Sequence, residues 1–220
     1  MSNRPCRLCF LAFAAILLFA GPLMAAPSFR GYTGLVAVPT ADTLDEGDYN
    51  AAIFTLDLEE GVDSNVFAAN LGLAEALEIG FAHFDPERGS GETFINAKYR
   101  FAPETAERPA FAAGVVDFTD EVDTTVYIVI TRSLAEPYQM DLDQIVAPQL
   151  HLGIGGGQFD GLFAGLSAVV GERLTIMIEY DSDDINLGAN LPLNDEFIAH
   201  FAILDAFDDI GLGISYNKSL

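Results

Sequence analysis

Residues 31–47 are GYTGLVAVPTADTLDEG, and the organisation of the chain can be worked out from this stretch. Gly31 and Gly34 stand three residues apart, and glycines let neighbouring backbones approach closely. Strand formers follow at 35–38, and Pro39 ends the extended run because proline cannot donate to a strand ladder. We predict an extended anchor that ends in a turn and either joins the wall of the following fold or tucks into its interior.

After this stretch the chain repeats one event, a short run with apolar residues at every second position and then a cluster of Gly, Asp, Asn or Pro. Side chains alternate between the two faces of a strand, so each such run predicts a half-buried strand. In the run 94–101, Ile95 and Tyr99 share the apolar face, while Asn96 and Lys98 share the other. The predicted strands are 49–57, 65–73, 77–84, 94–101, 110–118, 125–133, 149–156, 162–170, 174–181, 185–191, 197–204 and 210–216.

Strands with one apolar and one polar face fit two all-β structures. In a soluble secreted β-sandwich the apolar faces pack together, whereas in an antiparallel transmembrane β-barrel they meet lipid. The polar faces here are rich in Gly, Ser, Asn and Ala, which suit a narrow lumen, and closure of the sheet removes its exposed edges. Tyrosines near strand ends are typical of an interfacial girdle: Tyr49, Tyr99, Tyr180 and Tyr216. We predict a barrel of about 12 strands, with the sandwich as the alternative.

The N-terminal residues have the pattern of a secretory signal peptide. Arg4 and Arg7 precede an apolar run, Leu8–Ala20, and small residues follow at Ala25 and Ala26. The apolar run is too short to span a membrane as a helix. We predict cleavage after Ala25, which leaves residues 26–220 as the outer-membrane barrel domain.

The 220-residue chain combines strong acidity with a high apolar content. It has 33 acidic and 10 basic residues, a formal net charge of −23 and 50% hydrophobic residues. Binding of nucleic acid is excluded, because it needs a basic surface. Both cysteines, Cys6 and Cys9, precede the cleavage site, so disulfides and thiolate metal sites are excluded from the mature chain. The expected location is the cell outer membrane, and the expected partners are its lipid and lipopolysaccharide.

The connections between predicted strands differ in charge. If both ends of the domain are periplasmic, the odd-numbered connections are extracellular, and these carry most of the acidic residues. One long connection, Leu134–Pro148, leaves open a short plug, an extra strand or a different strand count. Carboxylates close together suit Mg²⁺ or Ca²⁺, so we hypothesise that the acidic rim recruits a divalent cation that bridges it to lipopolysaccharide or a surface polysaccharide. The alternative is a set of solvated loops without metal, and the candidate ligands are Asp181, Asp183, Asp184, Asp205, Asp208 and Asp209.

Charged residues are predicted inside the barrel as well. Lys98 and Arg100 share the polar face of one strand, and we predict that they pair with Glu179 and close the lumen. The alternative is a constriction that guides anions or sugars. His151 is also predicted to face the lumen and could act with Ser167 as the base and nucleophile of a hydrolase. Because no glycine-flanked serine elbow is present, we predict a structural histidine, no catalytic residue and no cofactor.

The opening stretch also resembles the motif near the start of the YjbH-like family of outer-membrane barrels, which are associated with exopolysaccharide production. The segment Leu174–Gly188, with Glu179-Tyr180-Asp181 and Asn186-Leu187-Gly188, is similar to a recurring hairpin of that family. The resemblance implies a single short module that supports exopolysaccharide or envelope organisation without catalysis. Other possibilities are a small passive channel, an outer-membrane hydrolase and a secreted adhesin. The matching motif residues are Gly31, Thr33, Gly34, Leu35, Pro39, Thr40, Ala41, Leu44, Gly47 and Tyr49.

Overall fold

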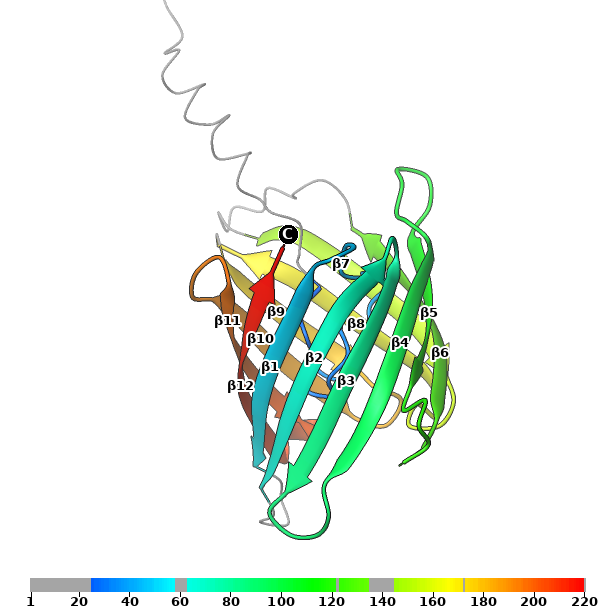
Figure 1. Ribbon diagram of the computed structural model, residues 1–220. Coiled ribbons are helices and arrows are strands. Elements are labelled where there is room, and N and C mark those ends of the chain that lie inside the picture. Colours follow the sequence, from blue (N-terminus) through cyan, green and yellow to red (C-terminus); the bar gives the residue numbers. More distant parts are fainter. Residues whose placement is uncertain (1–24, 58–62, 122, 135–144, 172, 220) are drawn as a thin grey trace, which may run out of the picture.

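The computed structural model describes residues 25–57, 63–121, 123–134, 145–171 and 173–219. These residues form a closed antiparallel barrel of 12 strands, in which each strand pairs with its neighbours in sequence and β1 pairs with β12. Figure 1 shows the barrel from the side, with the C-terminal end of β12 at the upper rim. The strands are β1 (Tyr49–Asp57), β2 (Ser64–Ala74), β3 (Leu77–Pro86), β4 (Glu92–Ala102), β5 (Ala110–Val116), β6 (Thr125–Ser133), β7 (Ile145–Gly155), β8 (Gly161–Val170), β9 (Leu174–Tyr180), β10 (Ile185–Pro192), β11 (Phe197–Leu204) and β12 (Asp209–Lys218).

All 12 predicted strands are confirmed, with small differences at their ends. The largest difference is in β7, which begins at Ile145, four residues before the predicted strand. In β5 the strand ends at Val116 because Asp117 adopts a positive φ of 54°, a conformation that a strand does not allow. The predicted signal peptide and most of the Leu134–Pro148 connection lie outside the described residues.

The apolar faces point outward around the whole barrel. Exposed large side chains include Phe81, Ile128, Leu152 and Ile178, and exposed tyrosines stand near both ends, Tyr99 at one and Tyr180 at the other. A single closed sheet with an apolar exterior is the architecture of a barrel in lipid. The sandwich alternative is therefore wrong, because there are no two stacked sheets to hide these side chains. No helix among the described residues is long and apolar enough to cross a membrane.

The N-terminal segment, residues 25–48, lies inside the lumen, and we call it the plug (Figure 1, blue). It starts beside β1, where the Ala25 carbonyl accepts a hydrogen bond from Asn50 Nδ2 at 3.1 Å, and it ends beside β2. Two isolated bridges, Pro27 with Thr33 and Gly34 with Pro39, fold it into compact turns. Of the two predicted positions of the opening stretch, the interior one is confirmed.

The lumen is packed like the core of a soluble protein. Two clusters of buried side chains combine plug residues with wall residues. In one, Tyr32 and Val38 of the plug pack with aromatic side chains of the wall, including Tyr127 and Phe163. In the other, Phe29 of the plug stacks beside Phe54 with ring centroids 4.5 Å apart. The plug and the wall therefore form one hydrophobic unit.

The end of the plug is fixed against β2 at a glycine. The Gly47 N–H donates to the Gly72 carbonyl, and the Gly72 N–H donates to the Asp48 carbonyl, each at 2.9 Å. A β-carbon on Gly72 would lie 1.9 Å from the Asp45 carbonyl oxygen, which is a backbone atom and has no flexible way to move aside. The wall thus has the shape that this plug requires.

We expect Gly72→Ala to lower the free energy of unfolding by about 1–3 kcal/mol, because overpacking forces the plug end or β2 to shift. The matched control is Gly156→Ala, since a β-carbon at Gly156 meets nothing within 4 Å. Thermal unfolding in detergent micelles, followed by circular dichroism, measures both. Equal melting temperatures for the two variants would contradict the close fit.

Candidate functional site

The strongest plug contact is made by a buried carboxylate on β9. Glu179 is only 2% exposed and accepts three successive backbone N–H groups of the plug, from Val36 at 3.0 Å, Ala37 at 2.6 Å and Val38 at 3.2 Å. Successive N–H groups that converge in this way form an anion-binding concavity. Asn186 Nδ2 on β10 donates to the same carboxylate at 3.1 Å. Glu179 therefore holds the plug at four points.

A second buried carboxylate, Glu78 on β3, holds the opposite side of the plug. Its oxygens accept the Thr33 hydroxyl at 2.6 Å and the Leu44 N–H at 3.0 Å. Lys98 on β4 donates to the Thr33 carbonyl at 3.0 Å and to the Thr33 hydroxyl oxygen. The Lys98 ammonium lies 3.9 Å from Glu78, and both side chains are 2% exposed. This plug residue is therefore held between a cation and an anion of the wall.

The predicted pairing of Lys98 and Arg100 with Glu179 is wrong. Strand register places Lys98 directly opposite Glu78 on the neighbouring strand, while the Glu179 carboxylate is occupied by the plug. Arg100 shares the inward face of β4 with Lys98 and is half-buried. Its charge and that of Lys98 lower the pKa of Asp42 in the plug, but the larger effect of burial leaves that pKa raised.

The predicted lumen position of His151 is confirmed. His151 is buried with Thr131 Oγ1 2.9 Å from its Nδ1 and Ser167 Oγ 3.1 Å from its Nε2. The plug covers this group, since the Ala41 N–H donates to Thr131 Oγ1 at 2.9 Å. A threonine stands where a hydrolase would have a carboxylate or amide to orient the histidine. The arrangement binds the plug to the wall and leaves no path for a substrate to the Ser167 hydroxyl.

The other two histidines have different surroundings. His200 is buried, with Asn190 Oδ1 2.9 Å from its Nδ1 and Ser215 Oγ 2.8 Å from its Nε2. His83 faces outward and has Thr93 Oγ1 2.6 Å from its Nδ1. Neither histidine lies near the His151 group in the strand order.

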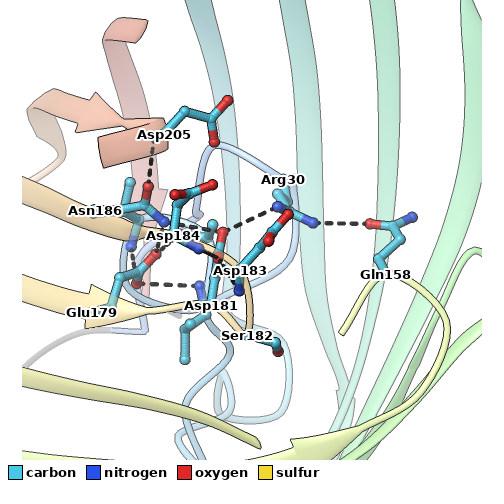
Figure 2. A network of polar contacts seen from close by, with 12 residues as sticks. Arg30, Gln158, Glu179, Asp181, Ser182, Asp183, Asp184, Asn186 and Asp205 are labelled. Carbon is cyan, nitrogen blue, oxygen red and sulfur yellow. Dashed lines mark hydrogen bonds and ion pairs between the residues drawn. The ribbon is translucent and has the colours of Figure 1, made fainter. Parts of the chain in front are cut away.

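The tip of the plug is attached at the end of the barrel opposite Tyr49 and Lys218, which we call the distal end. Arg30 Nη2 lies 3.3 Å from Asp181 Oδ2, and its Nη1 donates to Gln158 at 3.3 Å (Figure 2). Asp181 also accepts the backbone N–H groups of Asp183 and Asp184 at 3.3 and 3.0 Å. Its carboxylate therefore serves the plug and its own turn.

The predicted cation ligands lie on two neighbouring distal connections. Figure 2 shows Asp205 above Asn186, whose Oδ1 accepts the Asp205 N–H at 3.1 Å. Burial raises the pKa of Asp205 to about 6, and a hydrogen bond with Asp209 and the charge of Asp184 add to this rise. Within the described ranges, no group of three or more His, Cys, Asp or Glu side chains is arranged to hold a metal ion. The acidic-rim cation stays a prediction.

Pattern reasoning missed several residues that hold the plug, notably Glu78, Thr131 and Arg30. A usable signal exists for Glu78, because it is a lone acid on the inward face of β3 and shares that face with Gly80 and Ala82. An acid among small residues on a lumen face needs an internal partner. No comparable signal marks Thr131.

Comparisons with known proteins support the fold. No protein-family model matches the sequence, and no curated protein matches it either. Among solved structures, the chain is similar to the KdgM porin, with a TM-score of 0.55, 9% identity, and coverage of 78% of this chain and 99% of that chain. The KdgM porin in complex with disordered oligogalacturonate gives a TM-score of 0.54 at the same identity and coverage. A Rhodopseudomonas blastica porin mutant gives a TM-score of 0.34 and 13% identity, over 70% of this chain and 55% of that chain. The KdgM similarity establishes a shared barrel fold.

Proposed function

We propose that this protein is a YjbH-like outer-membrane barrel that supports exopolysaccharide production or envelope organisation, without catalysis and without an open pore. The observation that carries the proposal is the filled lumen. Glu78 and Glu179 hold the plug from opposite sides, and aromatic packing closes the space between. An apolar exterior with tyrosines near both ends supports the outer-membrane location.

The motif residues support the resemblance because they build this plug. Thr33 bridges Glu78 and Lys98, and Leu35 is buried in the second core cluster. Gly31 has a φ of +94°, which favours glycine, at the turn behind the Arg30 tip. Each of these residues has a role that a related barrel with the same plug would need.

Two alternatives receive less support. A passive channel needs an unobstructed lumen, and a hydrolase needs a substrate path to Ser167, which the plug covers. The fold shared with KdgM does not decide between open and closed barrels, since function resides in the lumen and loops of a fold.

The proposal is tested with the full chain expressed in its own host. We expect it in the outer-membrane fraction, with gel migration that changes on heating, and with no steady conductance in planar bilayers. A strain that lacks the gene is expected to lose surface polysaccharide, and both the wild type and Ser167→Ala are expected to restore it. Steady conductance of the wild type would favour a channel, and failure of Ser167→Ala alone would favour a hydrolase.

A further inference from the structure

A recess opens at the distal end, beside the plug tip and between the ends of β2, β3 and β4. Its volume is about 220 Å³, and it is lined by Ser64, Phe84, Pro86, Ser90 and Glu92. Strand register brings these residues together, because Ser64 lies opposite Pro86 and Phe84 lies opposite Glu92. The β3–β4 connection is fastened beside it by the Glu87 N–H, which donates to the Asp63 carbonyl at 2.8 Å.

The floor of the recess is a fixed aromatic ring. Phe84 stacks on Phe94, with ring centroids 5.3 Å apart and planes inclined at 24°. The same side chain packs against both core clusters of the lumen, so it cannot turn away. One part of its surface remains in the recess and presents a flat apolar patch.

Polar groups surround this floor. Ser64 contributes a hydroxyl and is 5% exposed, while Ser90 and Glu92 are exposed at the edge. Within the part of the chain that the structure describes, the side chains of Ser90 and Glu92 form no hydrogen bond with the protein. A few convergent polar groups around an apolar surface are typical of a small-molecule site.

The size and charge of the recess restrict its ligand. Sites for drug-sized ligands occupy roughly 300–1,000 Å³, so this smaller recess suits a single ring. A sugar ring offers a face of C–H groups for the phenyl ring and hydroxyls for the serines and the carboxylate. The neighbouring charges are Asp63, Asp85, Glu87 and Glu92 against Arg88 alone, which disfavours an anionic sugar.

We propose that this recess binds one uncharged sugar residue at the end or branch of a surface polysaccharide. The inference deepens the proposed function and rests on it, because it needs the distal end to face the cell exterior. The recognition elements are the Phe84 ring as the stacking platform, and the hydroxyl and carboxylate groups of Ser64, Ser90 and Glu92 as hydrogen-bond partners.

The chain contains no tryptophan, so Phe84→Trp places a single fluorophore at the floor of the recess. We expect methyl glycosides of neutral hexoses and N-acetylhexosamines to change its emission in a saturable way. Galacturonate and glucuronate are expected to bind at least about tenfold more weakly, because each brings a carboxylate beside Glu92. Saturation-transfer NMR on the wild-type protein in micelles tests the same contacts without any substitution.

Glu92→Gln is expected to weaken binding of neutral sugars severalfold and to reduce the discrimination against uronates. Asp85→Asn is the matched control, since it removes the same charge from an exposed position on β3 outside the recess. The proposal is overturned if no neutral sugar binds the wild type, or if uronates bind as tightly. These measurements use purified protein, so their failure leaves the polysaccharide phenotype intact, whereas a missing phenotype with sugar binding intact counts against the proposed function alone.

Discussion

Replacing Glu179 with alanine is expected to release the plug from the wall and to convert a closed barrel into one that conducts ions. The substitution removes the only carboxylate acceptor that the structure gives to the N–H groups of Val36, Ala37 and Val38. Each buried donor left without a partner costs about 1–3 kcal/mol, so the plug loses on the order of 5 kcal/mol of attachment. The strand ladder does not depend on this side chain, so the wall is expected to remain closed. Planar-bilayer recordings measure the result as steady conductance that the wild type lacks.

Two further variants separate loss of attachment from loss of charge. Glu179→Gln keeps one acceptor oxygen and is expected to give a smaller, intermittent conductance. Asp183→Ala removes an exposed carboxylate near the same end and is expected to behave as the wild type. Folding of each variant is checked first by heat-modifiable gel migration. A folded Glu179→Ala barrel that stays silent would show that apolar packing alone holds the plug.

The barrel could be predicted from the sequence because strand faces repeat with a period of two. In β9, for example, Ile176 and Ile178 point outward while Met177 and Glu179 point inward, as the alternation predicts. Distinguishing lipid from a sandwich core needed one more observation, the small polar residues on the opposite face, such as Asn186 and Gly188. The geometry of lipid-facing strands explains why this was sufficient, since an alternating pattern states which face is apolar but not what covers it.

The plug position could not be decided in the same way. Its partners are distant in sequence, because the Ala37 N–H meets a carboxylate 142 residues away and the Thr33 hydroxyl meets one 45 residues away. The acceptors of the plug N–H groups are side chains of the wall, and a local pattern contains no information about them. An extended segment that joins the wall and one that enters the lumen have the same strand formers and the same stopping proline. The two possibilities therefore stayed open until the barrel was closed around the segment.

The prediction for Lys98 succeeded in direction and failed in partner. Alternation along β4 determines that it faces the lumen, and this is confirmed. Its partner depends on register, which sets Lys98 beside Glu78 on the adjacent strand. Glu179 belongs to β9, five strands away from β4 in the barrel order, and its carboxylate already holds the plug.

Replacing Lys98 with methionine should lower the free energy of unfolding by about 3–5 kcal/mol, the usual effect of removing one partner from a buried ion pair. The Glu78 carboxylate would keep the Thr33 hydroxyl and the Leu44 N–H but lose its nearest cation. The Thr33 carbonyl would lose a donor as well. Thermal unfolding in micelles measures the loss, and it should appear even if the barrel remains closed to ions.

The double variant Lys98→Met with Glu78→Gln should recover most of that stability, because an uncharged amide no longer needs a cation and still offers an oxygen to the plug. Arg132→Met is the matched control for charge removal. Arg132 lies 3.5 Å from Glu104 in a pair that is 37% and 28% exposed, so its loss should cost less than about 1 kcal/mol. If Lys98→Met and Arg132→Met melt alike, the cation between Glu78 and Thr33 contributes little, and the plug is held on that side by its apolar contacts.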